Sequence, residues 1–363
     1  MLSPGVKAAL AECELGHRDT RFSQLLARLR HNARHIFLSG DEHSILFIGG
    51  PATAAIEAVC ASLLPHDASV LVPVNGVFGA RIAEILDLHQ IRHTPVDFGF
   101  GKPFDLDRLE AVIATGRRRG FTAVAMAHHE TSAGLLNPVA AIGVLARKHG
   151  LKFIVDATSS AGAEDLDVTR DGIDACITTS GKCLHGAPGL GLVCVRRELL
   201  KASKATRARS YSLDLHRFHD QLEGTGQTPF TSSVPLFLAL DCAIEELLLE
   251  GGVDARRRVY LRRREILAAG MTRLGLPLFP LPPGSEAASI LTVGVPESVS
   301  FESLYATAKD HGYLIYASKP PLAPHYFQVA VMGEFADDGL LDFLDVMRLL
   351  THTAPAPYLT VPA

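Results

Sequence analysis

Short apolar runs alternate with longer segments of helical periodicity between about residues 45 and 195, and this alternation restricts the fold more than any other feature. Strands separated by helices form βαβ units, so the sequence predicts an α/β protein with a largely parallel sheet. We predict strands at residues 44–48, 69–74, 122–127, 152–155, 175–178 and 190–195, and helices at residues 53–64, 79–89, 105–114 and 138–149.

The pattern changes near the proline-rich stretch Pro277–Pro283. Two long helices come before this stretch, and a small α+β unit is predicted after it. We therefore expect a large domain over residues 15–254 and a small C-terminal domain over residues 255–363, with residues 1–14 packing on the small domain. The elements predicted in this part are helices at residues 234–249, 255–274, 301–311 and 339–350, and strands at residues 289–295, 313–317 and 326–331.

Composition argues against several classes of protein. The chain has 363 residues and a formal net charge of −4, whereas nucleic-acid-binding proteins usually carry a basic excess. Its six cysteines lack CxxC spacing, as expected for free thiols in a reducing compartment. Its 16 histidines show no metal-ligand spacing, and neither a transmembrane run nor a signal peptide is evident. We therefore expect a cytoplasmic protein that binds no nucleic acid, membrane or metal.

Two polar residues follow apolar strands in an order that suits one cofactor. Asp156 ends the apolar run Phe153–Val155, and at the carboxyl end of a parallel strand such a group faces the ligand crevice. Lys182 follows in the loop Ser180–Gly189, which is rich in Gly, Ser and His. A lysine amine can hold pyridoxal phosphate as a Schiff base, while a carboxylate pairs with the pyridine nitrogen. A lone loop lysine is more often a surface residue, so the combination with Asp156 favours the cofactor site.

The segments around these two residues resemble the cofactor-binding segments of class V aminotransferases. The resembling segments are Ile154–Ser160, Ser180–Gly191, His128–Pro138, Asn75–Arg81 and His17–Phe22. Within that family they look most like those of the 2-aminoethylphosphonate–pyruvate aminotransferases. The resemblance implies PLP fold-type I, as in aspartate aminotransferase, with pyridoxal phosphate as cofactor. It also implies transamination between an amine such as 2-aminoethylphosphonate and pyruvate, in a homodimer with shared active sites.

The resemblance implies a role for each matched residue. Lys182 would carry the Schiff base and transfer protons, and Asp156 would bind the pyridinium nitrogen. Phe78 would stack on the ring. The cofactor phosphate would lie at the amino end of the helix predicted at residues 53–64, since helix N-termini bind anions. The other candidates are Ala52 and Thr53 for the phosphate, Thr231 for the phosphate of the other subunit, Thr131 or Ser132 for the ring hydroxyl, Thr158 beside the ring, and Gln328, His17, Arg18 and His185 for the substrate.

Three positions depart from the family pattern. Pro51 replaces a residue that offers a hydroxyl and an N–H group to the phosphate, and Gly181 replaces Asn or Gln. Gln328 replaces an arginine that binds the acidic group of the substrate, and an amide lacks the bidentate charge of a guanidinium. The cations that could substitute for that arginine are Arg18, Arg81 and Lys319.

These departures leave alternatives open. One is another class V enzyme with a different pair of amine and oxo acid, or with a lyase reaction. A lyase of the desulfurase type needs a mobile cysteine, whereas we expect Cys183 to be packed. An alternative of another class is a non-catalytic scaffold or regulator with the same fold.

Overall fold

The computed structural model describes residues 1–12, 15–116, 120–296 and 299–351. A seven-stranded sheet with the strand order β1-β9-β8-β7-β4-β2-β3 dominates the structure. The five strands from β8 to β3 run parallel, whereas β9 is antiparallel to both β8 and β1. The predicted α/β fold with a largely parallel sheet is therefore confirmed. The strands are β1 (His43–Gly49), β2 (Ser69–Val74), β3 (Arg92–Asp97), β4 (Ala123–Ala127), β7 (Lys152–Asp156), β8 (Ala175–Thr179) and β9 (Leu190–Arg196).

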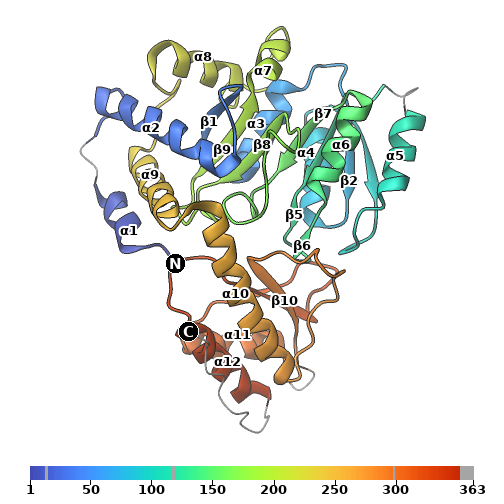
Figure 1. The fold of residues 1–363 in the computed structure, drawn as a ribbon, viewed down its shortest axis with the longest axis vertical. Helices are drawn as coiled ribbons and strands as arrows, with labels where there is room; N and C mark the ends of the chain where they lie inside the picture. Colours follow the sequence, from blue (N-terminus) through green and yellow to red (C-terminus); the bar gives the residue numbers. More distant parts are fainter. Residues whose placement is uncertain (13–14, 117–119, 297–298, 352–363) are drawn as a thin grey trace.

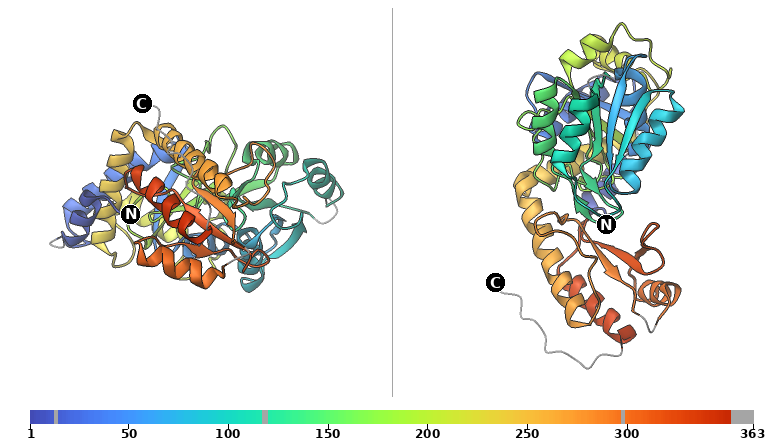
Figure 2. Two further views of the ribbon diagram at one scale, coloured as in Figure 1. Left: turned by 90° about the horizontal axis from the view of Figure 1, so that it is seen from below. Right: turned by 90° about the vertical axis from the view of Figure 1, so that its right-hand side faces the viewer.

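Helices cover both faces of this sheet, as the right-hand view of Figure 2 shows. The inner strands are covered on both sides and are mainly apolar, and every residue of β4 and β8 is buried. No helix in the described part of the chain is both long enough and apolar enough to cross a membrane. The helices of this part are α1 (Pro4–Ala11), α2 (Thr20–Phe37), α3 (Ala52–Leu63), α4 (Val77–Leu88), α5 (Leu106–Thr115), α6 (Val139–His149), α7 (Arg197–Ser203), α8 (Leu215–Thr225) and α9 (Val234–Leu249).

The helix α10 (Gly252–Arg273) leads from the large sheet to a smaller C-terminal unit (Figure 1). This unit has its own apolar core and an antiparallel sheet with the strand order β10-β12-β11. The predicted domain boundary at residue 255 falls inside α10 and stays a prediction. The other elements of this unit are β10 (Ile290–Gly294), β11 (Tyr316–Ala317), β12 (Tyr326–Ala330), α11 (Phe301–Asp310) and α12 (Asp338–Thr351).

The first helix, α1, lies beside α9 (Figure 1), where Val6 packs with Ala239 and Ala243. The carbonyl oxygen of Met1 accepts a hydrogen bond from the backbone amide of Glu334 at 3.0 Å. Residues 1–12 therefore contact both units of the chain. Their assignment to the small domain stays a prediction.

Candidate active site

Five segments with predicted site residues meet at one edge of the large sheet. The parallel strands β2, β4, β7 and β8 all end at this edge, and the antiparallel strand β9 begins there. Gly49, at the end of β1, pairs with Leu190 at the start of β9. The backbone amide of His128 donates to the carbonyl of Asp156 at 2.8 Å, which joins two of the segments directly. The segments are Gly49–Thr53, Asn75–Arg81, His128–Ser132, Asp156–Thr158 and Thr179–Gly189.

Asp156 places a buried carboxyl group at this edge. Its Oδ1 atom accepts hydrogen bonds from the amide of Thr158, at 2.9 Å, and from the Thr158 hydroxyl. Its Oδ2 atom lies 3.8 Å from a guanidinium nitrogen of Arg81. Burial raises the pKa of Asp156, and the Thr158 hydrogen bonds and the Arg81 charge oppose this rise. A buried carboxyl group with a cation at this longer distance can accept a closer cationic partner, such as a protonated ring nitrogen.

Glu130 fixes the start of α4 and with it the half-buried ring of Phe78. Its Oε2 atom accepts hydrogen bonds from the amides of Phe78 at 3.1 Å and Gly79 at 2.9 Å. The hydroxyl of Ser132 donates to the other carboxylate oxygen. A carboxylate at a helix N-terminus pairs with free N–H groups and interacts favourably with the helix dipole. Glu130 was not among the predicted site residues, although it positions the predicted ring-stacking residue Phe78.

The amino end of α3 offers free N–H groups that can bind an anion, and it lies beside the loop that carries Lys182. In the described chain no side chain caps this end, where Pro51 occupies the N-cap position. The amides of Ala52 and Thr53 belong to the first turn, whose N–H groups lack intrahelical partners. The amide of Gly50 donates to the carbonyl of Gly189 at 2.8 Å, so α3 starts next to the loop that carries Lys182. Because proline has no N–H group, this end of α3 has one N–H donor fewer than it would have with another residue at position 51.

Lys182 is exposed, but the loop that carries it is well fixed. The hydroxyl of Ser180 donates to the carbonyl of Ala187 at 2.5 Å, and the amide of His185 donates to the carbonyl of Lys182 at 3.0 Å. A Cβ atom at Gly181 would lie 2.9 Å from the ring of Pro188. An Asn or Gln at position 181 would therefore force Pro188 to shift, which accounts for glycine at this position.

Gln328 reaches from the small sheet to the segment predicted to flank the ring. Its Nε2 atom donates to the carbonyl of Thr131 at 2.6 Å and to the hydroxyl of Thr292 at 3.2 Å. Both hydrogens of the amide are therefore engaged by protein acceptors. The Thr131 hydroxyl makes a long hydrogen bond of 3.3 Å to the carbonyl of His129, whereas the Ser132 hydroxyl binds Glu130. Of the two predicted partners for a ring hydroxyl, Thr131 is the more available.

Arg18 lies beside the segment that carries Thr231. Its guanidinium donates to the carbonyl of Thr228 at 2.7 Å and to the side-chain oxygen of Gln227 at 3.1 Å. Thr231 is exposed, three residues before α9 begins. No hydrogen bond or ion pair among the described residues joins His17, Arg18 or Thr231 to Lys182 or Asp156. Their site roles stay predictions.

The His185 ring connects the lysine loop to the small unit. Its Nε2 atom lies 3.0 Å from the amide of Gly333 and 2.5 Å from the hydroxyl of Tyr260. Burial lowers the pKa of His185 to about 3, so the ring is neutral and this nitrogen accepts from both groups. The contact makes His185 part of the junction between the two units, and its predicted role in substrate binding stays a prediction.

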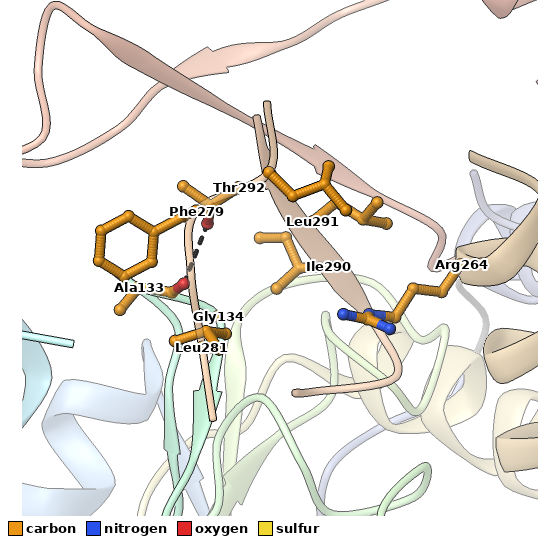
Figure 3. A pocket seen from close by; sticks show the side chains of 9 residues that line it. Ala133, Gly134, Arg264, Phe279, Leu281, Ile290, Leu291 and Thr292 are labelled. Carbon is orange, nitrogen blue, oxygen red and sulfur yellow. Dashed lines mark hydrogen bonds between the residues drawn. The ribbon is translucent and has the colours of Figure 1, made fainter. Parts of the chain in front are cut away.

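A small cavity lies where the small sheet meets the segment after Thr131 (Figure 3). Its volume is about 20 Å³, close to the room that one water needs. The hydroxyl of Thr292 donates to the carbonyl of Ala133 at 3.1 Å across its edge. Neither Lys182 nor Asp156 lines this cavity, so it is a packing gap and not the cofactor site.

Cys183, which follows Lys182, is completely buried and lies 3.7 Å from the sulfur of Met332. Burial raises the pKa of its thiol to about 12. Such a thiol is not the mobile, low-pKa nucleophile that a desulfurase needs, which argues against this form of the lyase alternative. Within the described ranges, no group of three or more His, Cys, Asp or Glu residues is placed to hold a metal ion.

The residues at this edge suit pyridoxal phosphate. The cofactor combines an aldehyde, a ring nitrogen that takes a proton, a flat aromatic ring and a phosphate. The exposed amine of Lys182, the buried carboxyl group of Asp156, the ring of Phe78 and the open end of α3 offer one complementary group for each. The partly unpaired guanidinium of Arg81, whose Nε atom is buried without a hydrogen-bond partner in the described chain, lies among them.

Comparison with known proteins agrees with this description. The family model for aminotransferase class V matches residues 6–304. A 2-aminoethylphosphonate–pyruvate transaminase of Burkholderia mallei is 38% identical over 327 residues, which cover 90% of this chain and 87% of that protein. The 2-aminoethylphosphonate–pyruvate transaminase 1 of Burkholderia lata is 39% identical over 94% of this chain and 90% of its own length.

Solved structures are similar over nearly the whole chain. Ureidoglycine–glyoxylate aminotransferase from Bacillus subtilis superposes with a TM-score of 0.89 at 25% identity, covering 97% of this chain and 91% of that one. Pyridoxamine–pyruvate aminotransferase from Mesorhizobium loti has a TM-score of 0.87 at 23% identity, covers the same shares of the two chains, and shows the likeness of fold. The predicted fold-type I architecture, the transaminase class and the cofactor, pyridoxal phosphate, are thereby confirmed, and the chain belongs to the class V aminotransferase family.

Proposed function

We propose that the protein transfers the amino group of 2-aminoethylphosphonate, or of a similar aminophosphonate, to pyruvate. The observation that carries this proposal is the identity of 38–39% to transaminases named for that pair, over at least 90% of the chain. The arrangement around Lys182 and Asp156 supports the same reaction class. We further propose a cytoplasmic location, because the five cysteines in the described ranges are free thiols.

In this proposal the residues at the sheet edge divide the work. The bound cofactor supplies a conjugated ring that stabilises negative charge at the carbon next to the amino group. Lys182 holds the cofactor and moves a proton at its Nζ atom, while Asp156 keeps the ring nitrogen protonated. Phe78 covers one face of the ring. The amides of Ala52 and Thr53 bind the phosphate, Thr131 binds the ring hydroxyl, and Thr158 orients Asp156 through its two hydrogen bonds.

A second candidate is the same reaction with a different pair of amine and oxo acid. Gln328 favours it, because both hydrogens of its amide are bound by Thr131 and Thr292 and it carries no charge. A carboxylate or phosphonate that loses water in this pocket needs a charged partner. The two candidates differ in the substrate and share the roles of Lys182 and Asp156.

Separate half-reactions test the substrate pair. With the purified holoenzyme and no acceptor, 2-aminoethylphosphonate is expected to remove the long-wavelength absorbance of the cofactor, and pyruvate is expected to restore it with formation of alanine. An amine that lacks the phosphonate, such as ethanolamine, is the matched control. If ethanolamine or another neutral amine reacts while 2-aminoethylphosphonate leaves the spectrum unchanged, the second candidate replaces the first.

We propose that the active enzyme is a homodimer in which Thr231 completes the phosphate site of the partner. Thr231 is exposed just before α9, and among the described residues no hydrogen bond or ion pair joins it to Lys182 or Asp156, which supports this. Thr231→Glu would put a negative charge beside the phosphate, so this variant and Lys182→Ala are each expected to be inactive. A 1:1 mixture that re-forms dimers should regain about a quarter of the wild-type activity, since half of the dimers are mixed and each holds one intact site.

Thr225→Glu is the control for the dimer experiment, because Thr225 is exposed at the end of α8 and bonds only within that helix among the described residues. It should stay active by itself. A mixture that forms mixed dimers but gains no activity would contradict the shared site, as would full activity of a dilute monomer.

A further inference from the structure

His129 is a buried imidazole that the roles above leave unused. It lies in the short strand β5 (His129–Glu130), which pairs with β6 (Leu135–Leu136), and it comes two residues before Thr131. Its side chain is almost inaccessible, since only 3% of the residue is exposed. A buried polar group at a cofactor site either has a structural partner or serves the reaction.

One ring nitrogen of His129 is bonded and the other is not. Nδ1 lies 3.0 Å from the carbonyl oxygen of Ser159, and because a carbonyl only accepts, Nδ1 carries the hydrogen. Nε2 therefore presents a lone pair, and it is buried without a hydrogen-bond partner in the described part of the chain. Burial lowers the pKa of His129 to about 4, so the ring is neutral near pH 7. An unpaired buried acceptor is unfavourable unless a donor reaches it during function.

Lys182 is the donor that the surroundings indicate. The Ser159 carbonyl that fixes His129 also accepts a contact from the thiol of Cys183 at 3.4 Å, and Cys183 follows Lys182 directly. The positive charge of Lys182 acts on the His129 ring and contributes to its lowered pKa. The ring and the loop that carries Lys182 thus share one anchor, the Ser159 carbonyl, and the charge of Lys182 helps to lower the pKa of His129.

We propose that Nε2 of His129 accepts a hydrogen bond from the Nζ ammonium of Lys182 and positions this side chain whenever it is not joined to the cofactor. The inference rests on the proposed role of Lys182 as the reactive amine. His129 is a positioning residue, because it acts through Lys182. A neutral acceptor orients the ammonium without adding a negative charge beside it. A negative charge would hold the proton of the ammonium, whereas next to a neutral ring Lys182 can still transfer that proton.

Two substitutions separate this role from simple packing. His129→Asn keeps a side-chain N–H near the position of Nδ1, and with it the bond to Ser159, but it ends short of Nε2. His129→Gln carries an amide oxygen to the position of Nε2. We expect His129→Asn to lower kcat about tenfold with little change in KM, and His129→Gln to recover most of the loss.

A second measurement avoids the reaction altogether. Full-length protein freed of cofactor is acylated with acetic anhydride, and the modification of Lys182 is followed by peptide mass spectrometry. An ammonium held by a hydrogen bond releases its proton less readily, so His129→Asn is expected to speed acylation of Lys182 several-fold, up to about tenfold, and His129→Gln to slow it again. His128→Gln is the matched control, because His128 is as deeply buried, and the charges that act on its pKa are those of His129, Asp171 and Asp165.

Equal rates of Lys182 acylation in the wild type, His129→Asn and His129→Gln would overturn the inference. Thermal unfolding of each variant shows whether it is folded, and His129→Thr serves as a second variant without an acceptor if His129→Asn does not fold. Acylation requires neither substrate nor turnover. A failure of this inference can therefore be told apart from a failure of the proposed function.

Discussion

Lys182→Ala is expected to abolish transamination and to remove the long-wavelength absorbance of the covalently bound cofactor. Lys182 lies in the loop between β8 and β9, which opens at the same edge as Asp156 and the amino end of α3. Removing its amine removes both the covalent attachment and the group that transfers the proton. Proton transfer by a positioned group alone contributes about 10²–10⁴-fold to a rate, so the loss of turnover should be at least of that order. Steady-state kinetics and absorbance spectra of the purified variant measure both effects.

Lys204→Ala is the control for this variant. Lys204 is exposed and pairs with Asp220 at 2.9 Å on the surface, and such a pair contributes at most about 1 kcal/mol to stability. Its activity and spectrum should match the wild type. Lys182→Ala should still bind pyridoxal phosphate without a covalent bond, since Asp156 and the free amides at the amino end of α3 remain. Equilibrium dialysis measures this binding. Full activity in Lys182→Ala would disprove the assignment of the site.

Core strands and helices, and the edge of the sheet that carries the site, can be predicted from the local sequence pattern. The sequence predicts β2 (Ser69–Val74) and α9 (Val234–Leu249) with the bounds that the structure shows, because each is an apolar segment between turn or capping residues. Parallel strands have their carboxyl ends at one edge, so residues that follow several strands must converge there. This rule alone brings Asp156 and the Lys182 loop together, although they are far apart along the chain.

Some elements of the structure were not predicted from the sequence, and one was predicted too long. The edge strand β3 (Arg92–Asp97) has Val96 as its one buried residue, so it lacks the apolar pattern of an inner strand. The helix α2 could have been predicted from the helical spacing of Leu25, Leu29 and Ile36. The tyrosine segment predicted as a strand at residues 313–317 is reduced to Tyr316–Ala317.

Long-range polar partners could not be predicted from local pattern. Glu130 binds the amides of Phe78 and Gly79, and the His185 ring binds Gly333 and Tyr260, across many residues of chain. Periodicity specifies which face of an element is buried, but not which buried donor meets which acceptor. The unpaired nitrogen of His129 likewise becomes visible only when its neighbours are in place.

Gln328→Arg is expected to raise kcat/KM for pyruvate by about tenfold or more. The side chain at position 328 already reaches the segment beside the ring site, where Gln328 donates to the carbonyl of Thr131. A guanidinium has five N–H donors, so it can keep this bond and still present a charged pair to a carboxylate. Hydrogen bonds to charged groups contribute about 1.5–3 kcal/mol, which corresponds to tenfold or more in rate. Steady-state kinetics with pyruvate, and separately with 2-aminoethylphosphonate, measure the gain.

Two of the three cations considered for this role, Arg18 and Arg81, are engaged elsewhere, which argues for a gain and not a loss. Arg18 is held by Thr228 and Gln227, and Arg81 lies against Asp156 and over the ring of Phe78. Gln328→Met, which is similar in length but lacks charge and N–H groups, separates the loss of the Thr131 bond from the gain of charge and should lower activity. Reduced activity of Gln328→Arg with every acidic substrate would mean that another cation already serves the pocket. Unchanged kinetics with all of them would place residue 328 outside the substrate pocket, because a new charge within reach of a desolvated carboxylate must alter its binding.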